Sequence, residues 1–500
     1  VLLFDANGDG FNDLLVTKGG NSLPPDDPAY QPKLFLNDGH GHFQPAASDA
    51  LPTLTNNIGA VAAADFTHNG TLGLFLGGRV ITGQYPFPAQ SVLLVNRKGK
   101  FEDVTEAFAP GLRNVGMVTA ALWSDVDGDG WADLLVALEW GQVKYFHNNA
   151  GQGLDDWTDK AGFSTTGSGW WTSLAAADFN GDGKLDYVVG NVGLNTQYQA
   201  DAQHPAVLFA GDFKGDGSSE LIEAYYEGDK LYPWRSRRNL VAVFPALARR
   251  YPTADSFSTA TVTDIFGEKK ITAAQKFTAT ELRSGVFLSQ KDGTYKFSPL
   301  PRIAQISPLQ GLVAGDFDGD GHADIYAVEN SFAPIPSVGR NDGGLSQLLL
   351  GDGHGEFRPV PPLESHLLVR GDAKALAVID LDHDGWPDFV VSRNNTTTLA
   401  FRNRGKAGHH SLRVILHGPP GNPTGVGARV ILETSDGTAQ ISEVYAGSGY
   451  YSQSSAACFF GYVDGNPPKT LHVRWATGES TEASVPAEAK EVVITFNGKS

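Results

Sequence analysis

Cysteine, charge and long apolar runs are all scarce in this chain of 500 residues. The single cysteine, Cys458, excludes a disulfide within the chain. No apolar run approaches the roughly 20 residues that a helix needs to span a bilayer. Charged residues make up only 19% of the chain, and 56 acidic against 38 basic side chains give a formal net charge of −18. This acidic balance argues against a nucleic-acid partner.

Turn-forming residues are abundant instead. The chain has 59 glycines and 28 prolines, a composition typical of a globular β protein with many turns. It starts at Val1, inside a repeated motif described below. We therefore interpret the sequence as a processed or incomplete chain, from which any signal peptide has been lost.

A nine-residue acidic motif recurs along the chain. Complete copies carry Asp or Asn at positions 1 and 3, Asp at positions 5 and 9, and glycine at position 6. Two further copies are degenerate: one at 65–73 has lost most carboxylates, and one at 212–220 has Lys214 at position 3. The five complete copies lie at 5–13, 125–133, 178–186, 316–324 and 380–388.

The residues around each copy predict short antiparallel strands. Small or apolar residues precede the motif, as at Ala62–Ala64, and an apolar run follows it, as at Leu134–Val136. A four-stranded unit repeated at this spacing is typical of a propeller blade. We predict an all-β fold: a seven-bladed β-propeller over 1–405 with a short helical insertion at about 227–285, and a small β-sandwich-like domain over 411–500.

Oxygen ligands in this register suit calcium, which accepts six to eight oxygens in irregular geometry. An EF-hand is excluded because its glutamate at position 12 is absent and the flanks predict strands. A single copy would be better explained as an acidic turn, but five copies in one register favour calcium. The predicted ligands, with the backbone carbonyl serving at the seventh position, are Asp5, Asn7, Asp9, Phe11 and Asp13; Asp125, Asp127, Asp129, Trp131 and Asp133; Asp178, Asn180, Asp182, Lys184 and Asp186; Asp316, Asp318, Asp320, His322 and Asp324; and Asp380, Asp382, Asp384, Trp386 and Asp388.

Electrostatics supports about five structural Ca²⁺ ions as the only cofactors. The five complete loops gather eighteen aspartates, which would repel one another without cations. In the copy at 212–220 the ammonium of Lys214 is expected to replace the ion, and the copy at 65–73 is expected to hold none.

These loops resemble the FG-GAP/VCBS repeats of integrin-α-like propellers, in which such loops bind calcium structurally. The C-terminal region resembles the ASPIC/UnbV domain of the cartilage acidic protein family, bacterial type, with Ala476 and Cys458 as departures. This resemblance implies an extracellular or cell-surface protein. The matching residues are Gly425–Val430, Glu443–Val444, Gly447–Tyr450, Ser452–Gln453, Phe460–Gly461, Val473–Trp475 and Gly478.

Residues 190–310 interrupt the repeat. Short helices are predicted at 240–250 and 256–266, with Ser236 and Asp255 as N-caps and Pro245 ending the first helix. Five arginines cluster here, and they either bind an anion or acidic sugar, with Trp234 and Tyr226 as stacking surfaces, or pair with acidic blade surfaces. The arginines are Arg235, Arg237, Arg238, Arg249 and Arg250.

No catalytic motif is found, and we assign no catalytic or organic cofactor residue. Two functions remain open. The first is a secreted or cell-surface module that binds protein or glycan. The second is a lyase-like carbohydrate-active enzyme with its site near 190–260; a pocket shared by Arg235, Tyr226, Asn195 and Trp170 would favour it.

The ends of the chain leave two questions open. In the C-terminal domain, strands are predicted near 411–417, 426–433, 439–446, 470–475 and 490–496. The last blade needs an outer strand, which upstream residues, the segment 411–417 or a partner chain could supply. Self-assembly is therefore also open.

Overall fold

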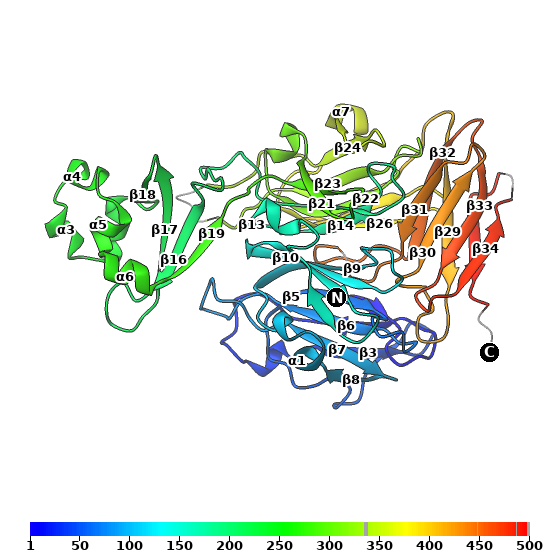
Figure 1. Ribbon diagram of the computed structural model, residues 1–500, viewed down its shortest axis with the longest axis horizontal. Helices are drawn as coiled ribbons and strands as arrows, with labels where there is room; N and C mark the ends of the chain where they lie inside the picture. Colours follow the sequence, from blue (N-terminus) through cyan, green and yellow to red (C-terminus); the bar gives the residue numbers. More distant parts are fainter. Residues whose placement is uncertain (335–338, 448, 487, 498–500) are drawn as a thin grey trace.

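The computed structural model describes residues 1–334, 339–447, 449–486 and 488–497. The chain consists mostly of antiparallel strands in nine sheets, which form a ring of sheets, a projecting arm and a C-terminal domain (Figure 1). No helix in these ranges is both long and apolar enough to cross a membrane. The all-β class predicted from the sequence is confirmed.

Six sheets follow one another around an axis, and each begins with its innermost strand. We call these six sheets blades 1 to 6. Blade 1 contains β1 Leu2–Phe4, β2 Asp13–Val16, β3 Lys33–Asn37 and β4 Phe43–Pro45; blade 2 contains β5 Ile58–Ala64, β6 Gly73–Gly78, β7 Val92–Arg97 and β8 Lys100–Asp103; and blade 3 contains β9 Met117–Ser124, β10 Asp133–Gly141, β11 Val143–Asn148 and β12 Leu154–Asp156, with β13 Gly169–Trp170 added. Blade 4 contains β14 Leu174–Ala177, β15 Asp186–Val189, β20 Gly285–Ser289 and β21 Tyr295–Pro299; blade 5 contains β22 Leu309–Gly315, β23 Asp324–Glu329, β24 Gln347–Gly351 and β25 Phe357–Val360; and blade 6 contains β26 Ala373–Ile379, β27 Asp388–Arg393 and β28 Leu399–Phe401.

Small residues let the inner strands approach the axis closely. The strand β5 reads IGAVAAA and is buried along nearly its whole length. A side chain at Gly59 would collide with the backbone carbonyl of Val118 in the neighbouring strand β9. Alanine and glycine at these positions therefore permit a packing distance that larger residues would prevent.

Six of the seven motif copies lie in this ring, and the remaining copy, at 212–220, lies outside it. It joins β16 and β17 in a separate sheet that we call the arm sheet. The predicted count of seven blades therefore stays a prediction.

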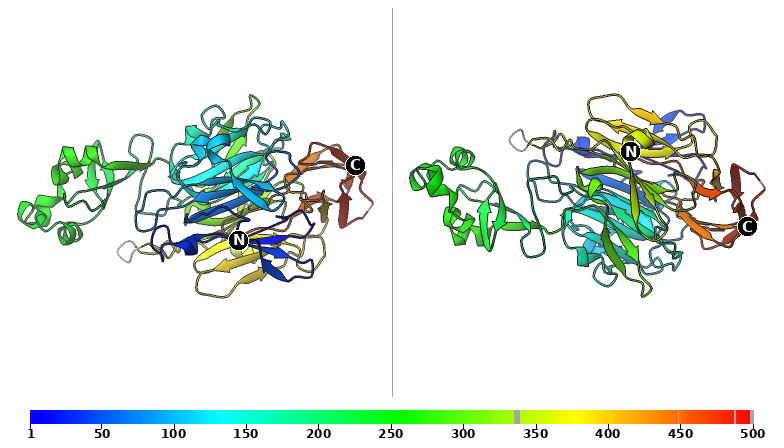
Figure 2. Two further views of the ribbon diagram at one scale, coloured as in Figure 1. Left: turned by 90° about the horizontal axis from the view of Figure 1, so that it is seen from below. Right: turned by 90° about the horizontal axis from the view of Figure 1, so that it is seen from above.

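The arm is inserted between β15 and β20 of blade 4 and projects away from the ring (Figure 2). Its sheet begins at residue 206, upstream of the predicted start at about 227. Ser236 caps α2 as predicted, by accepting a hydrogen bond from the backbone N–H of Asn239, whereas Thr253 and not Asp255 caps α4. The arm contains β16 Ala206–Gly211, β17 Glu220–Glu227, β18 Lys230–Pro233, β19 Gln275–Ala279, α2 Arg237–Val243, α3 Leu247–Arg250, α4 Ala254–Ser258, α5 Val262–Phe266 and α6 Glu268–Ala273.

The other helices are single turns between strands. They are α1 Thr105–Phe108 and α7 Pro362–Ser365, with the 3-10 turns Pro28–Tyr30, Pro110–Leu112, Phe163–Thr166 and Arg302–Gln305.

The C-terminal domain contains two sheets, ordered β32-β29-β35 and β31-β30-β33-β34. The segment 411–417 belongs to β29, which pairs with β32 and β35 and therefore adds no strand to blade 6. The five predicted strands are present, and two more were missed, β32 and β34. The strands are β29 His409–His417, β30 Arg429–Thr434, β31 Ala439–Glu443, β32 Ala457–Val463, β33 Pro468–Arg474, β34 Ser480–Ser484 and β35 Glu491–Thr495.

A segment of the C-terminal domain between β31 and β32 reaches the inner strands of the ring. The side chain of Gln453 pairs with the backbone N–H and C=O of Leu3 in β1, at 2.8 and 3.0 Å. Ala446 bridges Ala63 in β5, and the backbone N–H of Val378 in β26 donates to Ser454 Oγ at 3.0 Å. This segment, 443–455, which we call the axial segment, thus links blades 1, 2 and 6. Ser448 lies outside the described residues.

One apolar cluster is shared by the ring and the C-terminal domain. Leu2 and Phe4 of blade 1 and Leu74 of blade 2 belong to the same buried cluster as Leu412 and Trp475. The C-terminal domain is therefore packed as part of the main core.

Candidate metal-binding loops

The six motif copies in the ring all lie on one face of it. Each copy connects the innermost strand of a blade to its second strand, so successive copies are at the same end of successive blades. The arm emerges from a connection between second and third strands, which places it on the opposite face. In Figure 1 the C-terminal domain lies to the right of the ring and the arm to the left.

Each complete loop is shaped by its own carboxylates. The first aspartate accepts a hydrogen bond from the N–H of the glycine at position 6, for example Gly10 to Asp5 at 2.9 Å and Gly321 to Asp316 at 2.7 Å. The carboxylate at position 5 accepts from the N–H at position 7, as Trp131 donates to Asp129 at 2.8 Å. These hydrogen bonds bring the proposed ligand positions of each loop together. The same bond from position 7 is made by Phe11, Lys184, His322 and Trp386.

The aspartate at position 9 ties the loop to the blade. Asp133 accepts hydrogen bonds from the N–H of Val126 at 3.0 Å and from the N–H of Asn148, in the third strand, at 2.7 Å. The same pair of bonds is made in all five complete loops, and this residue is fully buried in each. The five are Asp13, Asp133, Asp186, Asp324 and Asp388.

Burial opposes ionisation of these carboxyl groups. It raises the pKa of Asp133 to about 6 and that of Asp186 to about 7, and it also raises the pKa of Asp316 above its usual value. Neighbouring carboxylates add to the effect, for example Asp320 beside Asp316. A bound divalent cation would favour the ionised forms and remove this penalty.

One oxygen shows that the donor set fits a hard cation. Asp125 is only 7% exposed, and its Oδ1 atom has no hydrogen-bond partner among the described residues. Oxygen atoms of Asp125, Asp127 and Asp133 lie within 4.8 Å of one another, and similar groups are found at 316–320 and 380–388. A buried, unpaired carboxylate oxygen among other carboxylates is costly unless a cation binds it.

The two degenerate copies keep the turn but lose ligands. In the arm, position 3 carries Lys214 in place of a carboxylate or amide, and its Nζ atom lies 2.9 Å from Glu220 Oε1. In blade 2 the N–H of Gly70 still donates to Asp65 at 2.8 Å, although position 9 is Gly73.

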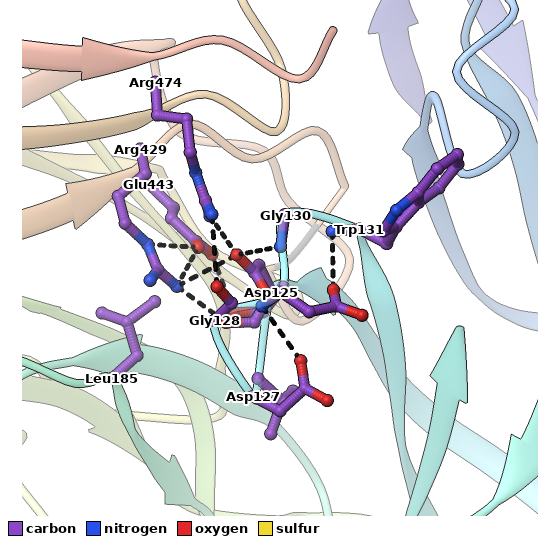
Figure 3. Close-up of polar contacts among 12 residues, drawn as sticks. Asp125, Asp127, Gly128, Gly130, Trp131, Leu185, Arg429, Glu443 and Arg474 are labelled. Atoms are coloured by element: carbon purple, nitrogen blue, oxygen red, sulfur yellow. Dashed lines mark hydrogen bonds and ion pairs between the residues drawn. The ribbon is translucent and has the colours of Figure 1, made fainter. Parts of the chain in front are cut away.

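Arginines of the C-terminal domain contact the loop of blade 3. Arg474 forms an ion pair with Asp125 and donates to the carbonyl of Gly128 at 3.4 Å (Figure 3). Arg429 Nη2 donates to the carbonyl of Asp125 at 2.7 Å and also pairs with Glu443 at 2.8 Å. The carboxylate at position 1 is therefore held from outside as well as from within its loop.

Two other loops meet the same domain. Arg413 Nη1 lies 3.5 Å from Asp380 Oδ2 in blade 6. Gly461 packs so closely on Asp316 of blade 5 that any side chain there would strike the carboxylate. The C-terminal domain thus contacts the first aspartate of the loops in blades 3, 5 and 6.

Two basic residues near the loops were missed in the sequence. His147 directly precedes Asn148, and Arg402 directly precedes Asn403. The backbone N–H groups of these two asparagines donate to the aspartates at position 9. His147 Nδ1 lies 3.2 Å from Asp127 Oδ2, and Arg402 pairs with Asp382 and Asp384. Leucine occupies this register in blades 1, 4 and 5, so aligning the third strands would have revealed both residues.

Asparagines in the third strands link neighbouring blades. Asn96 Nδ2 donates to the carbonyl of Ala6 at 2.9 Å, and Asn148 Nδ2 donates to that of Phe66 at 2.9 Å. Trp131 of blade 3 stacks on His68 of the adjacent loop in blade 2, with ring centroids 3.6 Å apart. The loops therefore support one another around the ring.

The insertion holds a second candidate site, an open groove of about 570 Å³ in the arm. Arg235 lines it, but Tyr226, Asn195 and Trp170 do not. The four residues named for an enzymatic pocket are thus not brought together in this groove. We call this pocket the arm groove. Its main polar and aromatic lining residues are Tyr225, Tyr232, Trp234, Arg235, Arg237 and Arg238.

Family models and relatives match both parts of the chain. A model described as FG-GAP-like repeat matches residues 5–76, 125–189 and 277–327, and one described as ASPIC and UnbV matches 418–500. Both resemblances seen in the sequence are confirmed.

Among curated proteins, the chain is 25% identical over 205 residues to cartilage acidic protein 1 of Mus musculus, covering 39% of this chain and 29% of that protein. The Homo sapiens protein of the same name is 24% identical over the same shares. The match therefore spans less than a third of these relatives. Among solved structures, the biofilm matrix protein Bap1 of V. cholerae aligns over 86% of this chain and 60% of that chain, with 10% identity and a TM-score of 0.25.

Proposed function

We propose that this chain, which carries FG-GAP-like repeats and an ASPIC and UnbV domain, is a secreted or cell-surface calcium-binding module for a protein or glycan ligand. About five Ca²⁺ ions would occupy the complete loops. Ligands would come from positions 1, 3, 5 and 9 and from the carbonyl at position 7. The ions would make the blade corners rigid and carry out no chemistry.

One observation carries this proposal: the loops face the C-terminal domain, whereas the arm projects from the opposite face. Arg474 and Arg413 contact the first aspartates of two loops, so these carboxylates are tied to the C-terminal domain. The arm projects away from the ring on the opposite side, and we assign ligand binding to it. Its groove favours binding over catalysis because the residues named for an enzyme pocket are not gathered there.

The test begins with calcium stoichiometry. Equilibrium dialysis of the intact chain should give about five tightly held ions. The labelled, calcium-loaded chain should then bind immobilised extracellular glycans or intact cells. A variant with a short Gly-Ser linker in place of 206–279 should keep its calcium but lose the binding. A chain that retains no calcium, or that binds equally well without the arm, contradicts the proposal.

A further inference from the structure

The walls of the arm groove are aromatic. Tyr225 and Tyr232 face each other across β17 and β18, and their ring centroids lie 6.2 Å apart. Trp234 lies two residues beyond Tyr232, with its ring 4.8 Å from that of Tyr225 and inclined by 38°. All three side chains are half-buried. Part of this aromatic surface is therefore open to a ligand.

Arginines line the same groove. Arg235 lies 3.7 Å from Glu223, so its charge is partly balanced. Arg237 Nε donates to the carbonyl of Tyr251 at 2.5 Å, which orients its guanidinium without neutralising it. Arg238 is exposed and has no ion pair among the described residues. Two uncompensated guanidinium groups thus stand beside three aromatic rings.

The arm differs in charge from the rest of the chain. Residues 200–283 contain eleven basic and eleven acidic side chains, so the whole net charge of −18 lies outside this segment. Almost all of that negative charge lies in the ring, so an anionic ligand would be repelled by the ring but could approach the arm.

The arginines and the aromatic rings of the groove together favour one class of ligand. Arginine binds carboxylate and sulfate groups through paired N–H donors, while aromatic faces stack against the C–H faces of sugar rings. A neutral glycan would make no use of the arginines, and a simple anion no use of the rings. We propose that the arm groove binds an acidic polysaccharide, with sugar rings on Tyr232 and Trp234 and acid groups on Arg237 and Arg238. This rests on the proposed binding function and names its ligand.

The calcium-loaded full chain should be titrated with polygalacturonate, heparin and neutral dextran of similar length. We expect both acidic polymers to bind and dextran not to bind, with affinity falling as salt rises. The two acidic polymers distinguish carboxylates from sulfates as the recognised group. Equal binding of dextran overturns the proposal.

Two charge reversals locate the site. Arg238→Glu should weaken binding about tenfold or more, as expected for loss of a charge-assisted contact and gain of repulsion. Arg249→Glu is the matched control: it changes an exposed helical arginine of the arm that does not line the groove, and it should change affinity less than about twofold. Equal losses in both variants would indicate diffuse charge attraction and overturn the assignment.

Failure of this inference can be separated from failure of the proposed function. If no polysaccharide binds, yet deletion of 206–279 still abolishes binding to cells, the binding function stands and the ligand class is wrong. Trp234→Phe keeps an aromatic ring and gives a further check. It should retain more than half of the binding, whereas Trp234→Ala should not; circular dichroism should show both variants folded.

Discussion

The ninth residue of a complete loop joins three parts of its blade. Asp133 accepts hydrogen bonds from the start of its loop and from the third strand, and it is fully buried. Asp129 at position 5 is exposed and accepts only from Trp131 within the loop. Both are proposed calcium ligands, but only Asp133 holds the blade together without the ion.

This difference predicts distinct effects of two alanine substitutions. Asp133→Ala leaves two buried N–H groups without acceptors and should cost about 3 kcal/mol even in chelator. Asp129→Ala should leave the free energy of unfolding almost unchanged in chelator. In calcium it should be less stable than the parent, because only the parent keeps this proposed ligand. Denaturant unfolding with and without calcium measures both. Equal losses in chelator would show that position 9 has no structural role beyond the metal.

Glu329 is a buried carboxyl group away from the loops. Its Oε2 atom accepts from the N–H of Ser346 at 3.1 Å, and Oε1 has no partner among the described residues. Burial raises its pKa to about 8, against about 4.3 in an unfolded chain. The folded state therefore holds a proton that the unfolded state releases between these two pH values.

Ionisation of Glu329 should make the folded chain less stable as pH rises. The stability from this proton is fully present below pH about 4 and is lost as pH rises toward 8, by up to about 1.4 kcal/mol per pH unit. Glu329→Gln lacks this loss, so it should gain stability relative to the parent between pH 5.5 and 8.5. Urea unfolding in saturating calcium tests this. Parallel pH profiles would show that Glu329 ionises normally.

At the scale of elements, the same nine-residue motif serves two different settings. In the ring, five copies gather carboxylates from positions 1, 3, 5 and 9, whereas in the arm Lys214 brings a positive charge to position 3 and pairs with Glu220. The lysine itself is visible in the sequence. Its place outside the ring is not, because β16–β19 form a sheet of their own through pairings that the motif does not encode.

The axial segment is an element that strand patterns do not reveal. It has little regular structure, yet Gln453 and Ser454 satisfy backbone groups of β1 and β26. Its glycine-rich sequence was noted only as a family resemblance. Gly447 explains part of that sequence, since its φ of 88° and its contact with Val61 leave no room for a side chain.

At the scale of the whole molecule, ring and C-terminal domain share one core. The apolar cluster joins Leu2 and Phe4 to Leu412 and Trp475, and Arg429 and Arg474 add polar links to blade 3. Such an interface is too continuous for two independent domains.

A truncation tests this cooperativity. A chain ending at residue 405 exposes the apolar cluster and should melt at least about 5 °C lower in calcium than the full chain, with increased binding of an apolar dye. The full chain should melt in a single calorimetric transition. Two separate transitions, with the truncated chain melting where the full chain's ring does, would show that the domains are independent.

What the sequence by itself determined is local. The nine-residue loops, the hairpins around them and five strands of the C-terminal domain follow from ligand spacing and from alternation over a few residues, and the turns close through hydrogen bonds between residues two to seven apart. Only the tertiary structure decided that the C-terminal domain contacts three loops, that the copy at 212–220 lies outside the ring and that aromatic rings and arginines line one groove. Those arrangements depend on contacts between residues tens to hundreds of positions apart, such as Arg474 with Asp125, and no local pattern specifies which distant surfaces meet.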